Sequence, residues 1–133
     1  MDRKRGINGR ELAGPAILVL LLLAGMLAAW YLNRHHTAMA EKMEDSSWMA
    51  LSGQWENAGE LAMSVRRDWE KGWRLRAVVT DHSPMEEIDS LFWELTVYEA
   101  AGERMEFARI CSILAEKLRS IAAAGGFSWW NVL

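Results

Sequence analysis

Residues 12–32 read LAGPAILVLLLLAGMLAAWYL and contain no charged side chain. A helix rises about 1.5 Å per residue, so this stretch would extend over roughly 31 Å. That length is close to the ~30 Å hydrocarbon thickness of a bilayer, and the residues are mostly Leu and Ala. The sequence therefore predicts a transmembrane helix over residues 12–32, with the rest of the chain held beside a membrane.

The two flanks of this stretch differ in charge. Four basic side chains precede it against two acidic ones, whereas acidic side chains outnumber basic ones just after it. Because Lys and Arg are retained in the cytoplasm, residues 1–11 should form a cytoplasmic basic flank and residues 33–133 should be exported. Trp30 and Tyr31 lie at the outer end, where amphipathic rings favour the headgroup layer. We expect a single-pass protein of the cell membrane.

A cleaved signal peptide is the alternative. Ala38-Met39-Ala40 fits the A-x-A pattern that signal peptidase accepts, and cleavage there would release a secreted helical protein. However, the apolar stretch is longer than the ~7–15 residues typical of a signal peptide. The pattern also lies several residues beyond the stretch, past Arg34 and two histidines. These observations favour an uncleaved anchor.

Composition limits what residues 33–133 can be. They have room for one small domain. Their 11 Lys or Arg and 16 Asp or Glu give a net charge of −5, which argues against nucleic acid and anionic lipid as partners. The single cysteine, Cys111, excludes an internal disulfide, so the domain must be held by its core. Few β-branched residues leave little room for a sheet, and we expect an all-α domain.

Helical periodicity divides this part into a juxtamembrane segment and a bundle. Residues 33–52 should continue the membrane helix up to a break at Ser52-Gly53. Residues 53–133 should form three helices, from Gly53 to about Val79, from Ser83 to Ala101, and from Glu103 to Gly125. Their apolar faces carry Trp55, Ala58, Ala62, Val65, Trp69 and Trp73; Met85, Ile88, Leu91, Phe92, Leu95 and Tyr98; and Phe107, Ile110, Cys111, Leu114, Leu118 and Ile121. Short connections favour an up-and-down bundle of three helices, or of four with the juxtamembrane segment.

Several features from Trp55 to Leu133 occur in an order that suggests a family. They are the helix opening Trp55/Ala58/Leu61, Trp69 near the end of that helix, Asp81-His82 before an acidic helix start, and the ending Asn131-Val132-Leu133. In this order the chain resembles domain of unknown function 4363, a family of small bacterial membrane proteins. The resemblance implies one amino-terminal membrane span and a short helical exported part. It implies no catalytic residue, because the family has no assigned activity.

His82 is the first candidate for chemistry, because Asp81, Glu86 and Glu87 lie near it in sequence. A histidine beside carboxylates is able to bind a metal or act as a general base, as in a membrane-tethered metal-dependent sensor or hydrolase. Metal sites draw ligands from several elements, however, and residues 53–133 contain no second histidine. We interpret Asp81 and His82 as turn and capping residues, and we expect no metal, cofactor or catalytic residue.

Two other reactive residue types have structural interpretations. Adjacent residues on a helix point about 100° apart, so His35-His36 is not a ligand pair and is interpreted as a polar flank of the membrane helix. Cys111 lies on an apolar stripe between Phe107 and Leu114, where a lone cysteine acts as a small buried hydrophobe.

The chain has eight tryptophans, a high count for its length. Most should belong to the core, since buried rings supply much of the apolar area of a small domain. Trp93 departs from the stripe formed by its apolar neighbours on the same helix and is the best candidate for contact with a partner. Trp129 and Trp130 are further candidates. They lie in the apolar tail of residues 127–133, which would cap the bundle, return to the bilayer or dock on another protein.

These features together predict a binding, assembly or accessory protein at the outer face of a bacterial membrane, rather than an enzyme. Its partners would be the lipid bilayer, through residues 12–32, and a protein whose identity the sequence does not indicate. No phosphate-binding loop, nucleophile motif or recognised metal-ligand spacing is present in the sequence.

Overall fold

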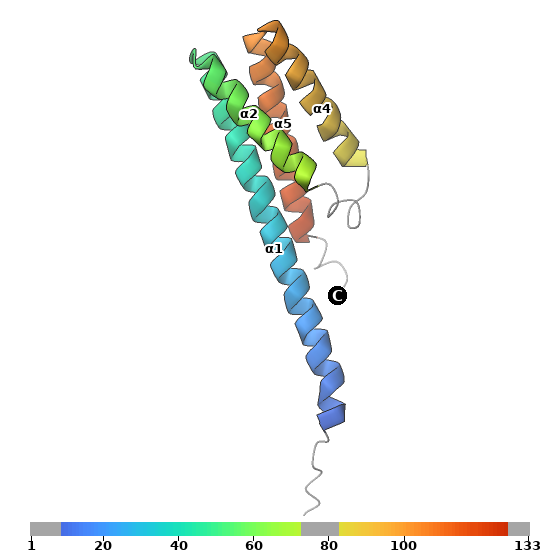
Figure 1. Ribbon diagram of the computed structural model, residues 1–133. Helices are drawn as coiled ribbons and strands as arrows, with labels where there is room; N and C mark the ends of the chain where they lie inside the picture. Colours follow the sequence, from blue (N-terminus) through green and yellow to red (C-terminus); the bar gives the residue numbers. More distant parts are fainter. Residues whose placement is uncertain (1–8, 73–82, 128–133) are drawn as a thin grey trace, which may run out of the picture.

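Four helices make up the part of the chain that the computed structural model describes, residues 9–72 and 83–127. In chain order they are α1 (Gly9–Leu51), α2 (Trp55–Lys71), α4 (Ser83–Ala101) and α5 (Arg104–Phe127). These residues include no strand. Figure 1 shows that successive helices alternate in direction, α1 and α4 running one way and α2 and α5 the other. The predicted all-α, up-and-down architecture is confirmed.

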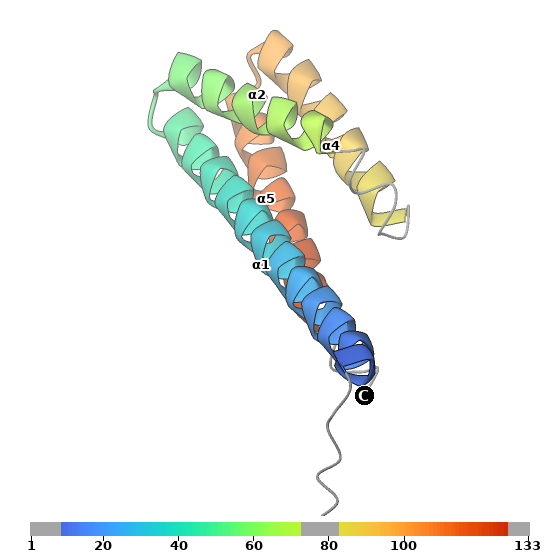
Figure 2. The same ribbon diagram turned by 60° about the horizontal axis from the view of Figure 1, so that its bottom comes forward.

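The two halves of α1 have different surroundings. The first half extends beyond the other helices, whereas the second packs against α2 and α5 (Figures 1 and 2). Nearly every side chain from Ala13 to Tyr31 is exposed, and buried side chains begin at His36. The juxtamembrane segment is thus the second half of α1 and the fourth helix of the bundle. Among the described residues, α1 is the one helix long and apolar enough to cross a membrane, by length and composition.

Two helices end where a glycine adopts a left-handed backbone. Gly53 has φ +89° after α1, and Gly102 has φ +71° after α4. In each case the next residue donates its N–H to a carbonyl five residues earlier, from Gln54 to Met49 (2.9 Å) and from Glu103 to Tyr98 (3.0 Å). This is the Schellman arrangement, which satisfies carbonyls at a helix end and which glycine adopts without steric cost. Both predicted breaks are confirmed.

Two other helix ends differ from the prediction. α2 ends at Lys71 rather than near Val79, and the N–H of Gly72 donates to the carbonyl of Asp68 (3.3 Å). Residues 73–82, which include Trp73, lie outside the described residues. α5 continues through Gly125-Gly126 to Phe127. A glycine costs a helix only about 1 kcal/mol relative to alanine, so two glycines do not by themselves end one.

The core lies between α2, α4, α5 and the second half of α1, and the three predicted apolar faces point into it. Its buried side chains are Met39, Ala40, Met43, Ala50, Ala58, Ala62, Val65, Trp69, Ile88, Phe92, Leu95, Phe107, Ala108, Ile110, Cys111, Leu114, Ala115 and Leu118. Ser46 Oγ donates to the carbonyl of Ala58 (2.7 Å) and Ser47 Oγ to that of Ala108 (2.9 Å). Because Ser46 and Ser47 have short side chains, α1 lies close to α2 and α5, and the two serine hydroxyls reach backbone carbonyls of those helices.

His36 belongs to this packed region. It is buried, and its ring centroid lies 6.1 Å from that of Trp69. The interpretation of His36 as a polar membrane flank is therefore wrong. The sequence of α1 places both histidines just after the apolar stretch, but the bundle already covers one side of α1 at that point.

Candidate interaction surface

The outer face of α4 carries a regular row of exposed side chains, Glu86, Ser90, Trp93, Val97 and Ala100, which we call the α4 seam. Their spacing of four, three, four and three residues keeps them along one side of the helix. The Trp93 side chain is 66% exposed and Val97 is 44% exposed, although both are large and apolar. The opposite face of α4 is buried in the core. The α4 seam is thus polar at Glu86 and Ser90, and its apolar residues Trp93, Val97 and Ala100 are left uncovered by the bundle.

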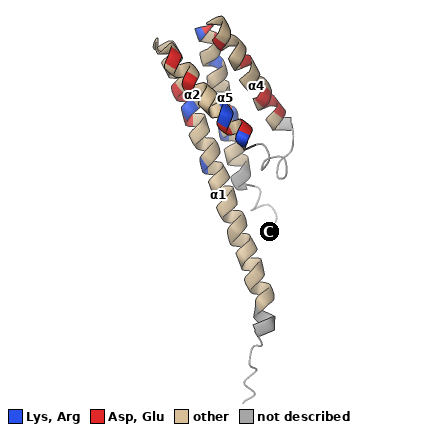
Figure 3. Ribbon diagram, in the orientation of Figure 1, with Lys and Arg blue, Asp and Glu red and all other residues tan. Residues whose placement is uncertain are grey.

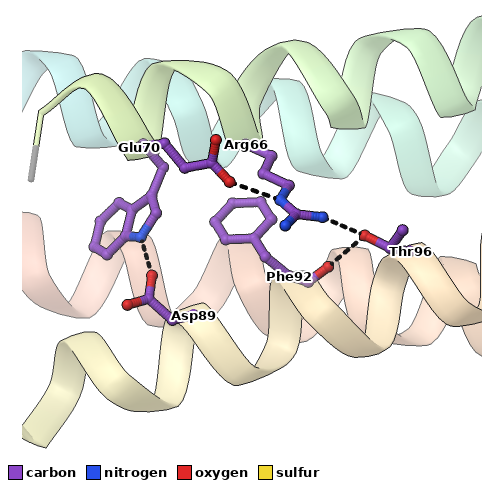
Figure 4. Close-up of polar contacts among 6 residues, drawn as sticks. Arg66, Glu70, Asp89, Phe92 and Thr96 are labelled. Carbon is purple, nitrogen blue, oxygen red and sulfur yellow. Dashed lines mark hydrogen bonds and ion pairs between the residues drawn. The ribbon is translucent and has the colours of Figure 1, made fainter.

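Polar contacts with α2 fix the rotation of α4 about its axis (Figure 4). The indole Nε1 of Trp69 donates to Oδ1 of Asp89 (2.6 Å). Arg66 donates from Nη1 to Oγ1 of Thr96 (2.5 Å) and pairs through Nε with Glu70 (2.9 Å). Thr96 in turn donates to the carbonyl of Phe92 in its own helix (3.0 Å). Because α2 contacts α4 at Asp89 and again at Thr96, α4 cannot rotate freely, and its Trp93 side chain faces solvent.

α4 carries charge of one sign only. It has five carboxylates and no Lys or Arg, as the colouring in Figure 3 makes plain. Glu87 pairs with Lys117 of α5 (2.8 Å), and Asp89 accepts the Trp69 indole. Within the described ranges no ion pair involves Glu86 or Glu94. The exposed apolar residues of the α4 seam therefore lie among carboxylates.

A groove of about 820 Å³ lies between α2 and α4. It is lined by Trp55, Gly59, Glu60 and Met63 from α2 and by Glu99 from α4. The Glu99 carboxylate rests directly on Gly59, so that a Cβ added at Gly59 would collide with its Oε1. Glycine therefore leaves room for this carboxylate between the two helices.

Replacing Gly59 by alanine should stabilise the bundle by up to about 1 kcal/mol, the usual difference between these residues inside a helix. The collision is with the end of a flexible, partly exposed side chain, which is able to turn away into the groove. Urea unfolding followed by circular dichroism would measure the change. A loss of stability in Gly59→Ala that is absent from a Gly59→Ala/Glu99→Ala double variant would show instead that Glu99 is held in place.

Cys111 is fully buried, as the sequence predicts, with its Sγ 3.7 Å from Ser46 Oγ. Burial raises the pKa of its thiol to about 12. The thiolate, which is the reactive form, is therefore absent from the folded protein near neutral pH. Cys111 is a packing residue in this structure.

This pKa predicts a loss of stability at high pH. The unfolded thiol ionises near pH 8.5, so the contribution of Cys111 is complete below that pH and is lost as pH rises towards 12, at about 1.4 kcal/mol per pH unit. Unfolding free energies of the natural chain and of Cys111→Ala, compared between pH 8 and 10, should show a shallower decline in the variant. An aromatic disulfide reagent should label Cys111 only in denaturant, and rapid labelling of the folded protein would contradict the burial.

The structure includes some of the predicted site residues and not others. Trp93 lies on the exposed face of α4, away from the core, as its departure from the apolar stripe indicates. Asp81, His82, Trp129 and Trp130 lie outside the described residues. Among the residues that are described, no three His, Cys, Asp or Glu side chains gather as metal ligands would. Val97 and Ala100 were not predicted to join Trp93, although their spacing from it is visible in the sequence.

Comparison with known proteins shows the family of the chain. The chain has no match among curated proteins and none among solved structures. A family model described as a domain of unknown function, DUF4363, matches residues 26–132, which include the end of the apolar stretch, the second half of α1, and helices α2, α4 and α5. The match confirms the resemblance seen in the sequence. The chain belongs to the DUF4363 family.

Proposed function

We propose that the chain is a single-pass membrane protein that presents its helical bundle for binding or assembly at the outer face of a bacterial membrane. The apolar first half of α1 would be the anchor, with the amino terminus in the cytoplasm. Its leucines project into solvent in the structure, where only a lipid environment or a partner would cover them. We assign the chain no reaction.

The packing of α1 supports an anchored form over a secreted one. Cleavage after Ala40 would remove Met39 and Ala40, which are 2% and 0% exposed and belong to the core. It would also remove His36 from its contact with Trp69. The bundle is therefore built from residues on both sides of the candidate cleavage site, and its stability depends on their remaining connected.

The observation that carries the binding role is Trp93. An exposed tryptophan on a rigid helix offers a large apolar area at little entropic cost, and tryptophan is enriched among the residues that dominate interface energies. Val97 extends the same surface by one helical turn. Trp48 is equally exposed on α1, at 65%, and provides a matched comparison.

Two experiments test this proposal in intact cells. For topology, Asn8→Cys and Ser52→Cys variants would be treated with a membrane-impermeant thiol reagent; the buried Cys111 provides the unlabelled background. We expect labelling at position 52 alone, and labelling at position 8 alone would show the opposite orientation.

For binding, a photo-crosslinking amino acid would replace Trp93 or Trp48. A discrete protein adduct from position 93 and not from 48 is expected, and equal yields from both would contradict a specific surface.

A further inference from the structure

We infer that the α4 seam binds one helix of another protein, and that this helix is amphipathic and basic. The inference rests on the proposed binding role and adds the class of partner. Alternating spacings of three and four residues are those of the a and d positions of a coiled coil, where side chains of a second helix interdigitate. On α4, Ser90 and Val97 take the a positions, and Glu86, Trp93 and Ala100 take the d positions.

The middle of the α4 seam suits such a partner. Trp93 and Val97 form an exposed apolar centre, and Ala100 leaves space for a helix to approach closely. Because the contacts of Asp89 and Thr96 with α2 hold α4 in place, the surface is preformed and loses little conformational entropy on binding. An amphipathic helix laid along a surface of this kind is a recurring mode of recognition.

The charges beside the α4 seam specify the sign of the partner. The flanking e positions are Glu87 and Glu94, and the flanking g positions are Asp89 and Thr96. Glu87 already pairs with Lys117, and Asp89 and Thr96 accept from α2, so the carboxylates that select a partner are Glu94 and, at a d position, Glu86. In coiled coils, charges that flank the apolar positions select the partner. The partner side chains that face these carboxylates should therefore be Lys or Arg. Glu94 and Glu86 make no ion pair within the described ranges and remain available to such side chains.

The same charges disfavour the two other occupants of an exposed apolar face. A second copy of the chain would bring two α4 helices together, each with five carboxylates and no cation, and like charges at facing positions repel. A bilayer with anionic lipids would be repelled in the same way. A basic amphipathic helix would cover the exposed apolar area and pair with the carboxylates that make no ion pair.

Peptide binding to the full chain in uncharged detergent micelles tests this inference. The probes would be two fluorescent three-heptad peptides with leucine at a and d, one with lysine and one with glutamate at the remaining positions. Anisotropy should report binding of the lysine peptide that weakens with added salt, beyond any signal from empty micelles. Trp93→Ala should weaken it roughly tenfold or more, as for an interface hot spot, and Trp48→Ala should not. Val97→Glu, at a second residue of the α4 seam, should also weaken binding of the lysine peptide.

A charge-reversal pair separates specific docking from general attraction to an acidic protein. Glu86→Lys/Glu94→Lys should abolish the salt-sensitive binding, whereas Glu41→Lys/Asp45→Lys, which changes α1 near Trp48 by the same net charge, should leave it unchanged. Equal losses in both pairs, or equal binding of the glutamate peptide, would overturn the inference. So would self-association of the chain that Trp93→Ala removes. An acidic or non-helical protein crosslinked at position 93 would overturn the partner class alone, and the absence of any adduct would overturn the binding role as well.

Discussion

Replacing Trp69 by alanine should lower the free energy of unfolding by about 3–5 kcal/mol, the range for loss of a buried aromatic side chain. Trp69 is 2% exposed, and its ring lies 6.3 Å from Phe92 of α4 and 6.1 Å from His36 of α1, measured between centroids. Its indole also donates to Asp89. One side chain of α2 therefore contacts two other helices, and the alanine variant loses packing at both.

Urea unfolding of the detergent-solubilised chain, followed by circular dichroism, would measure this loss. Trp93→Ala and Trp48→Ala are matched controls, because they remove the same side chain from exposed positions and should change stability by less than about 0.5 kcal/mol. Asp89→Asn isolates the polar contact and should cost about 1 kcal/mol, since the indole retains a neutral acceptor. If Trp69→Ala behaved like the exposed controls, the packing of α2 against α1 and α4 would be wrong.

The bundle core could be predicted from the sequence because helical periodicity is independent of tertiary structure. Ala58, Ala62, Val65 and Trp69 recur at spacings that place them on one side of any regular helix, whatever covers that side. The breaks at Gly53 and Gly102 were predictable for a similar reason. A left-handed residue ends a helix locally, and glycine is the residue that adopts it at no cost.

Features that depend on neighbouring helices could not be predicted in the same way. α4 has apolar residues around much of its circumference, and only the positions of α2 and α5 decide that Phe92 is buried and Val97 is not. The spacing of Val97 and Ala100 from Trp93 places all three on one side of the helix, but only the fold shows that this side stays uncovered. The bonds from Ser46 and Ser47 to backbone carbonyls depend likewise on which helices lie against α1.

The largest expected effect concerns the first half of α1. Leu20 and Leu21 lie near the centre of residues 12–32 and are 66% and 65% exposed. An arginine near the middle of a membrane helix costs about 3 kcal/mol, so Leu20→Arg/Leu21→Arg should disfavour insertion by roughly 6 kcal/mol. We expect this variant to leave the membrane fraction of the cells that produce it.

The matched control places two arginines on the same helix outside the apolar stretch, as Trp48→Arg/Leu51→Arg, at side chains 65% and 57% exposed. Alkaline carbonate extraction of membranes should retain this control with the natural chain and release the Leu20/Leu21 variant. Both variants should keep the unfolding behaviour of the bundle, because none of the four side chains belongs to the core. Retention of the Leu20/Leu21 variant would show that the bundle, and not α1, holds the chain at the membrane. Release of both variants would mean that the far end of α1 also contacts lipid, and Trp48 would then be a membrane residue rather than a control.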